Sequence, residues 1–341
     1  MKTDRIQRRI LWLLINPDTG RCRTETLPWI KLEPHKGQYD WRPLEEAALV
    51  YRNMGRSLLL AVETTAEDWV ERGAEDYFSF LRALGERCRA IPGFYSLDMS
   101  VPCGRTWSRE ELAGLSETCR EAFAFSRVMI PLSETELWEQ MSDWERAGLI
   151  LDSDRPVDET AERITAFGLQ KKWEHAPVRL DGCRLGREIL QNAVRWHISS
   201  ITTTEDAEDI ELASIGFRPE VRHCYTESEV RAGEKLPLKV WLVNTGNAPS
   251  YLNAFFKVRL LRTDADEEKV WKLSFPAGKL YPGEDYFLKE ELPVEGLSQG
   301  EYDLQIGLFD DNSGYPVSIG IEGRISDGFY STFLRVKVKE G

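Results

Sequence analysis

A change of pattern near residue 210 constrains the fold of this chain more than any other feature. Before it, short apolar runs alternate with segments whose apolar residues recur at helical spacing. Strands joined one after another by helices run parallel, because each crossover helix returns the chain to the same end of the sheet. After it, helical spacing disappears and each run alternates apolar with polar residues. The chain therefore predicts two domains of different class, residues 1–213 and residues 214–341.

The first part reads as a series of strand and helix units. Seven or eight units in about 210 residues fit a (β/α)8-type TIM barrel of reduced size. An open doubly wound sheet is the competing architecture, but no Gly-rich phosphate loop follows an early strand, which removes the usual support for nucleotide binding. We expect strands at 8–16, 57–65, 94–101, 127–132, 147–154, 176–182 and 197–204, with helices between them, one opened by a capping box of Ser133 and Glu136.

The second part predicts an antiparallel, immunoglobulin-like β-sandwich. Its strand candidates alternate apolar and polar residues, as in "LPLKVWLV" at 236–243, and Gly, Pro, Asn and Asp separate them. The fold class expected for the whole chain is thus α/β plus all-β. The sandwich could be a carbohydrate-binding module or a structural support for the first domain.

Composition limits the partners. The chain has 57 acidic and 44 basic residues and a net charge of -13, which repels phosphate backbones, so we expect no nucleic-acid partner. The apolar run "ILWLLI" is too short for a signal peptide, and no stretch reaches the roughly 18 apolar residues of a membrane span. We therefore expect a cytoplasmic protein with no membrane association. The sequence gives no indication of its oligomeric state.

The cysteines and histidines show no metal-ligand spacing. The six cysteines are scattered without a CxxC pair, and no histidine lies at the right distance from them. We expect free thiols, no metal and no cofactor.

Several stretches resemble known proteins. "LPWIKLEPHKGQYDW", residues 27–41, resembles a string near the start of clan A barrel glycoside hydrolases. Further blocks, among them "KKWEHAPVRLDG", "VWLVNTGNAPSYLNAFFKVRLL" and "QGEYDLQIGLFDD", resemble a bacterial glycoside-hydrolase-like family of unknown function, with a barrel followed by a β-sandwich. The resemblance implies a carbohydrate ligand. The chain departs from that family at two points, since "LDMSVPCGRTW" has no Glu between Asp98 and Trp107, and Asp181 stands where a Glu is usual.

Acidic residues at predicted strand ends are the candidates for chemistry. Reacting groups of such barrels lie at the carboxyl ends of the strands, and glycoside cleavage needs two carboxyl groups. We expect Asp181 as nucleophile or base and Glu63 or Asp98 as acid. An acid after a strand can equally cap the next helix. The candidates for contact with a sugar are Asp152, His197, Trp29, Trp107 and Trp173.

Three functions remain open at this point. The protein hydrolyses a glycoside, or it is a catalytically reduced barrel that binds a glycan or a protein, or it is a purely structural assembly protein. Glu33, in the first of the stretches above, is expected to bind backbone or a basic neighbour rather than a sugar, because Pro34 holds it in an extended conformation.

Overall fold

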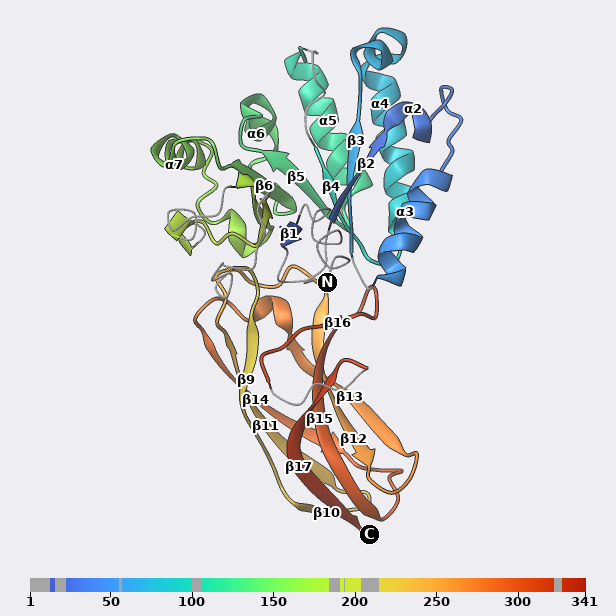
Figure 1. Ribbon diagram of the computed structural model, residues 1–341, viewed down its shortest axis with the longest axis vertical. Helices are drawn as coiled ribbons and strands as arrows, with labels where there is room; N and C mark the ends of the chain where they lie inside the picture. The colour runs from blue at the N-terminus through green and yellow to red at the C-terminus, as the bar shows by residue number, and fades with distance from the viewer. Residues whose placement is uncertain are drawn as a thin grey trace, which may run out of the picture. The chain divides into compact units, whose positions relative to one another are not determined.

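The computed structural model describes residues 13–15, 23–54, 57–99, 106–183, 191–192, 194–203, 215–321 and 327–341. The chain divides into two compact units, Met1–Leu212 and Ala213–Gly341. Figure 1 shows strands and helices in the first unit and β-strands in the second.

The first unit is built on one eight-stranded sheet. Its strand order is β1-β8-β7-β6-β5-β4-β3-β2, and all neighbours from β2 to β8 pair in parallel. The strands are β1 (Leu13–Ile15), β2 (Arg23–Pro28), β3 (Leu58–Glu63), β4 (Phe94–Asp98), β5 (Arg127–Pro131), β6 (Ala147–Asp152), β7 (Val178–Cys183) and β8 (Ser200–Thr203). The sequence missed β2, and only residues 13–15 of the strand expected at 8–16 are described.

The prediction of a full (β/α)8 barrel is wrong. The described strands form a curled, half-barrel sheet of seven parallel strands, and β1 pairs with β8 in the antiparallel sense. The connection from β1 to β2 is residues 16–22, shorter than the dozen or more residues that a parallel crossover needs. The first strand therefore cannot start a further strand–helix unit, and the described residues show no pairing of β1 with β2.

Helices connect the parallel strands. They are α2 (Trp29–Leu32), α3 (Arg42–Asn53), α4 (Ala66–Arg89), α5 (Arg109–Ala122), α6 (Thr135–Met141) and α7 (Val157–Ala166), with the 3-10 turn η2 (Lys172–Glu174). Thr65 and Ser108 open α4 and α5 with capping boxes. The capping box expected at Ser133 is wrong, because α6 has Glu134 as its N-cap residue and no side-chain cap. The helix expected between the strands at 176–182 and 197–204 lies only partly within the described residues.

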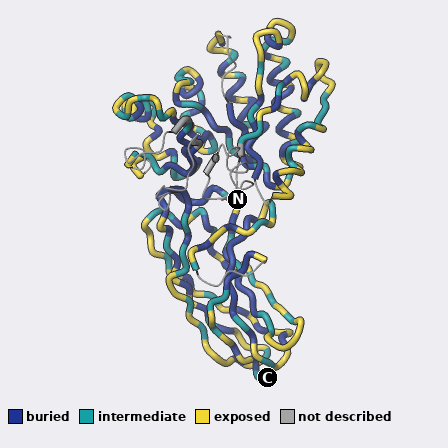
Figure 2. Tube along the Cα trace, in the orientation of Figure 1, coloured by how far each residue is buried: buried dark blue, intermediate teal, exposed yellow. Residues whose placement is uncertain are grey.

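The two faces of the sheet have different chemistry. Residues in register on neighbouring parallel strands point to the same side of a sheet. One face contains Leu60, Leu97 and Val128, all buried, and Glu25, which accepts a hydrogen bond from Tyr51 of α3 at 2.9 Å. The opposite face, called the inner face below, is defined by Thr24, Ser96, Asp98, Arg179 and Asp181. The inner face is therefore rich in polar groups, several of them buried. Figure 2 shows buried residues along the sheet and exposed residues on the helices and turns around it.

The second unit contains two sheets around one apolar core. One sheet has the order β10-β17-β15-β12-β13 with β16 on β15, and the other has the order β14-β11-β9. Except for β10 with β17, the pairs are antiparallel. The strands are β9 (Pro219–Thr226), β10 (Glu229–Arg231), β11 (Lys235–Asn244), β12 (Ala254–Arg262), β13 (Glu268–Pro276), β14 (Asp285–Pro293), β15 (Gly300–Asp310), β16 (Pro316–Val317) and β17 (Phe329–Lys339), with the 3-10 turn η5 (Ala277–Lys279).

Period-two alternation decides which side chains enter this core. On β11, Leu236, Leu238, Val240 and Leu242 are buried, as the sequence predicts. They belong to one apolar cluster with residues of β12 and β15, so both sheets share a single core.

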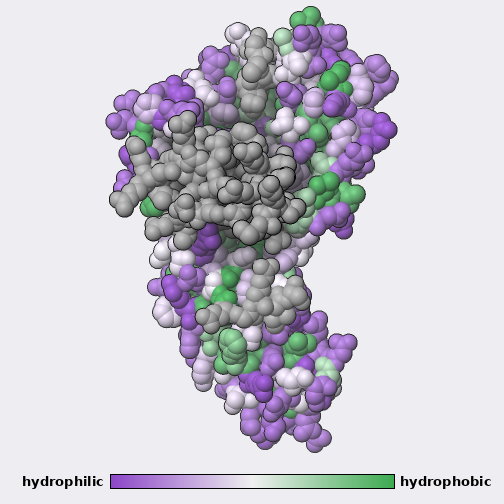
Figure 3. All heavy atoms as spheres, in the orientation of Figure 1, coloured by the Kyte–Doolittle hydropathy of each residue, from purple (hydrophilic) through white to green (hydrophobic). Residues whose placement is uncertain are grey.

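On the side shown in Figure 3, the described surface of both units is mostly hydrophilic, with hydrophobic residues in small groups. Cys88, Cys119 and Cys224 are free thiols, as expected from the sequence. Within the described ranges, none of the helices combines the length and the apolar character that crossing a membrane requires.

Candidate functional site

The first unit has one guanidinium that binds two of the three predicted catalytic acids. Arg179 Nη1 lies 2.5 Å from Asp98 Oδ2, and Arg179 Nη2 donates to Asp181 Oδ2 at 3.0 Å. Arg179 Nε lies 2.7 Å from Asp181 Oδ1. The three side chains therefore form a charged triad on the inner face, with Arg179 between the two carboxylates.

Asp98 is the enclosed member of this triad. It is 7% exposed, Ser96 Oγ lies 3.4 Å from its Oδ1, and Thr24 Oγ1 lies 3.5 Å from its Oδ2. Burial raises the pKa of Asp98 above its ordinary value, and the charge and hydrogen bond of Arg179 oppose that rise. Asp98 and Asp181 together raise the pKa of Arg179 despite its burial, so the guanidinium stays charged.

The acids at the carboxyl edge of the sheet differ in exposure. Asp181 is the fourth residue of β7, and its side chain is 36% exposed. Asp152 ends β6, pairs in register with Asp181 and is exposed, and its Oδ1 accepts a hydrogen bond from the backbone of Asp154 at 3.0 Å. Glu63 ends β3 and is exposed as well. The predicted acids thus share one edge, but among the contacts of the described residues only Asp98 and Asp181 have a common partner, Arg179.

Two of the predicted sugar-binding tryptophans are core residues in the structure. Trp29 is fully buried and Trp107 is 6% exposed. Both rings lie 5.3 Å from the ring of Trp69, and Trp29 also packs on Tyr77 and Phe80. Their faces are covered by other aromatic rings, so they stabilise the packing of α2, α4 and α5.

Trp173 and His197 lie at the other edge of the sheet. Trp173 is in η2, which precedes β7, and His197 precedes β8, so both are at the amino ends of the strands. Their rings stack with centroids 3.6 Å apart and an interplanar angle of 17°. Trp173 also lines a pocket of about 170 Å³, next to Val178 at the start of β7. The structure therefore separates this pair from the acids at the carboxyl edge.

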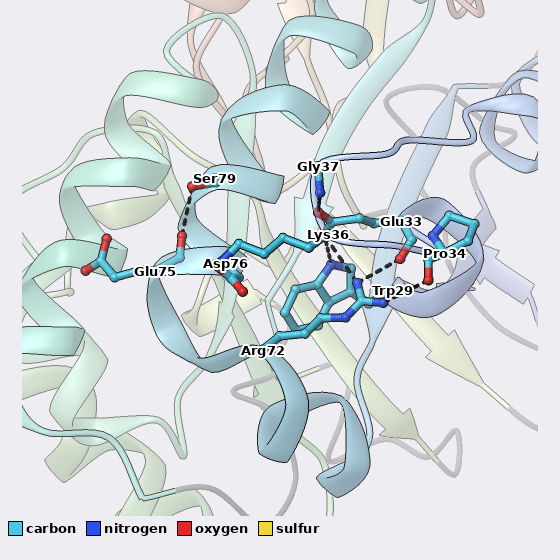
Figure 4. A network of polar contacts seen from close by, with 9 residues as sticks. All are labelled: Trp29, Glu33, Pro34, Lys36, Gly37, Arg72, Glu75, Asp76 and Ser79. Atoms are coloured by element: carbon cyan, nitrogen blue, oxygen red, sulfur yellow. Dashed lines mark hydrogen bonds and ion pairs between the residues drawn. The ribbon is translucent and has the colours of Figure 1, made fainter.

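Glu33 is held in the way the sequence predicts (Figure 4). It is 1% exposed, and its carboxylate accepts hydrogen bonds from Trp29 Nε1 at 2.7 Å and from the backbone N–H of Gly37 at 2.6 Å. Arg72 donates to the carbonyl oxygens of Glu33 and Pro34 at 2.7 and 3.3 Å, and it lies 3.4 Å from the carboxylate. The expectation that Glu33 binds backbone and a basic neighbour is confirmed.

Arg179 was not among the residues predicted from the sequence. The signal was available, because "PVRLD" places an arginine inside an apolar strand, two residues before an acid and on the same face. A charged residue at such a position is buried only when it is paired.

Within the described residues, no cluster of three or more His, Cys, Asp or Glu side chains could hold a metal ion. No protein-family model matches the chain. No curated protein matches it either.

Among solved structures, the similarities are distant. A CARDB domain from Pyrococcus furiosus is 17% identical, with 37% of this chain and 94% of that one covered and a TM-score of 0.22. A β-glucosidase from Listeria innocua is 13% identical over 72% of this chain and 41% of that one, with a TM-score of 0.25. The alkylpurine DNA glycosylase AlkC from Pseudomonas fluorescens is 11% identical over 76% and 54%, with a TM-score of 0.26. At TM-scores this low, the similarity to these three proteins assigns the chain to no family.

Proposed function

We propose that the first unit binds a carbohydrate at the carboxyl edge of its parallel sheet and does not cleave it. The observation that carries this proposal is the triad of Asp98, Arg179 and Asp181. A glycosidase needs one carboxyl group that gives a proton to the leaving oxygen and a second that attacks the sugar or activates water. Here the buried guanidinium of Arg179 binds both candidate carboxyl groups. This arrangement fits a structural and binding role of the two acids better than proton transfer.

The chemistry of the edge supports a sugar as the ligand. Exposed carboxylates accept hydrogen bonds from hydroxyl groups, and Asp152 and Asp181 lie side by side on neighbouring strands. The resemblance of residues 27–41 to glycoside hydrolases points to the same ligand class. In this proposal Arg179 and Asp98 position Asp181, and the exposed acids contact the sugar.

The alternative is a hydrolase, and one observation favours it. Burial raises the pKa of Asp98, and a raised pKa is what a carboxyl group needs to act as a general acid. Cleavage would require the Asp98 proton to reach the leaving oxygen of the sugar.

A glycan array followed by calorimetry on the full chain tests the proposal. We expect binding of an oligosaccharide without release of product, and roughly tenfold weaker binding for Asp152→Asn and Asp181→Asn. Asp143→Asn is the matched control, since Asp143 is exposed and lies in the loop before β6, at the amino edge. Hydrolysis that Asp98→Asn abolishes would establish the enzyme instead, and an array without any bound glycan would remove carbohydrate as the ligand.

A further inference from the structure

The outer face of the small sheet in the second unit presents aromatic and cationic side chains together. β9, β11 and β14 pair in register, so residues opposite one another form rows across the three strands. One row is His223, Trp241 and Phe287, and the next is Tyr225, Lys239 and Lys289. We call these six residues the aromatic face.

All six residues of the aromatic face are exposed. The exposed fractions are 37% for Trp241, 53% for Tyr225 and 65% for Phe287, whereas the opposite side of β11 is fully buried. The six residues line a hollow of about 340 Å³. Large aromatic residues gathered on a surface are uncommon in soluble proteins and mark binding sites.

The aromatic rings of this face are oriented by contacts with one another and with neighbouring side chains. Trp241 Nε1 donates a hydrogen bond to Asp285 Oδ1 at 2.8 Å. The rings of Trp241 and Phe287 stack with centroids 5.3 Å apart, and Lys239 Nζ lies 5.7 Å from the ring of Tyr225. Fixed rings lose little conformational entropy on binding, which favours affinity.

The charges indicate which ligand fits. Lys239 and Lys289 place two cationic groups side by side on a chain whose net charge is -13, so this part of the surface attracts an anion although the chain as a whole repels it. Asp285 and Glu291 flank the two rows along β14 and limit the cationic region to a short segment. A long polyanion such as single-stranded nucleic acid would meet these acids, whereas a short acidic oligosaccharide can place its carboxylates between them.

We propose that the aromatic face binds an acidic oligosaccharide. The rings stack on the apolar faces of the pyranose units, and the lysines pair with the carboxylates of the ligand. This site is separate from the one proposed in the first unit and does not depend on it.

Calorimetry of the full chain with tetragalacturonate, and with cellotetraose as the neutral counterpart, tests this proposal. We expect tighter binding of tetragalacturonate, a roughly tenfold or larger loss of affinity for Trp241→Ala and for Phe287→Ala, and a loss for Lys239→Gln/Lys289→Gln confined to the acidic ligand. High salt should weaken the acidic ligand alone.

Two control variants check that binding occurs at the aromatic face. Phe333→Asn removes an exposed aromatic ring on β17, where Asn tolerates the φ of 60°, and should leave binding unchanged. Asp143→Asn, at an exposed position of the first unit outside both proposed sites, should also leave it unchanged. The proposal is overturned if tetragalacturonate does not bind, if Phe333→Asn weakens it equally, or if Trp241→Ala instead abolishes self-association or binding of a single-stranded oligonucleotide.

Discussion

Arg179 on β7 contacts Asp98 on β4, with an Nη1–Oδ2 distance of 2.5 Å, although β5 and β6 lie between the two strands. In a flat sheet these strands would be about 14 Å apart, and side chains stand roughly perpendicular to a sheet. The contact therefore depends on the curl of the sheet, which brings the inner-face side chains of distant strands together.

Replacing Arg179 by Met should destabilise the first unit by about 3–5 kcal/mol, because the buried Asp98 carboxylate loses its countercharge. Urea unfolding, monitored by hydrogen exchange of the backbone amides of β4 and β7, measures the loss of stability. Arg82→Met is the control, since Arg82 and Glu121 form an exposed pair whose removal should cost at most about 1 kcal/mol.

Adding Asp98→Asn to Arg179→Met should recover part of that stability. The amide carries no charge, so the double variant no longer buries an unpaired carboxylate. A double variant less stable than Arg179→Met alone would show that Asp98 is stabilised by groups other than Arg179.

The pH dependence of stability should show the contribution of Lys172. This residue is 7% exposed, and its ammonium group donates to the carbonyl oxygens of Ser142 at 3.0 Å and Trp144 at 2.5 Å. Burial lowers the pKa of Lys172 to about 8. Between pH 8 and about 10.4, the ordinary value for lysine, the unfolded chain binds the proton and the native chain does not. The free energy of unfolding therefore rises with pH in this window, by at most about 1.4 kcal/mol per pH unit from this residue.

Lys172→Met isolates that contribution, since all other groups titrate in both proteins. The difference in free energy of unfolding, wild type minus variant, should increase from pH 8 to pH 10 and stay constant from pH 5 to pH 7. Parallel curves over the whole range would mean that Lys172 keeps its ordinary pKa in the native state.

In the first unit, the sequence predicts strands that are apolar on both faces and misses the polar strand β2 at the edge of the sheet. β3 and β6 are continuous apolar runs, and the structure has them within the expected ranges. β2, "RTETLP", is polar because it is the edge strand of the sheet, and its Glu25 is satisfied by Tyr51, 26 residues later. No local pattern records such a partner.

The candidate site, too, could be predicted only in part from the sequence. The positions of Asp152 and Asp181 at one edge follow from the parallel order of the strands, which the sequence does indicate. The burial of Trp29 and Trp107 depends on rings from α4 that come together only in the folded unit. The sequence also could not predict that the described sheet is a half barrel, because this depends on the direction of β1, a strand of three residues.

Glu33→Ala should destabilise the first unit by about 2–4 kcal/mol, because the N–H groups of Trp29 and Gly37 lose their buried acceptor. Thermal unfolding measures the effect. Glu75→Ala, at an exposed position on α4, should change the stability by no more than about 0.5 kcal/mol. Equal losses in both variants would rule out a special role for Glu33.

Gly73 interrupts α4 with φ 73° and ψ 179°, a conformation that is essentially restricted to glycine. A Cβ atom built at this position meets nothing within 4 Å, so Gly73→Ala introduces backbone strain without a steric clash. We expect a loss of roughly 1–3 kcal/mol in the free energy of unfolding. Ser79→Ala, exposed in the same helix, should cost less than about 0.5 kcal/mol.

The break at Gly73 directly follows Arg72, whose guanidinium binds the carbonyl oxygens of Glu33 and Pro34. If the break orients Arg72 toward Glu33, the two substitutions disturb the same network. Gly73→Ala combined with Glu33→Ala should then cost less than the sum of the single losses, by about 0.5 kcal/mol or more in urea unfolding. Strictly additive losses would show that the helix break and the Glu33 network stabilise the first unit independently.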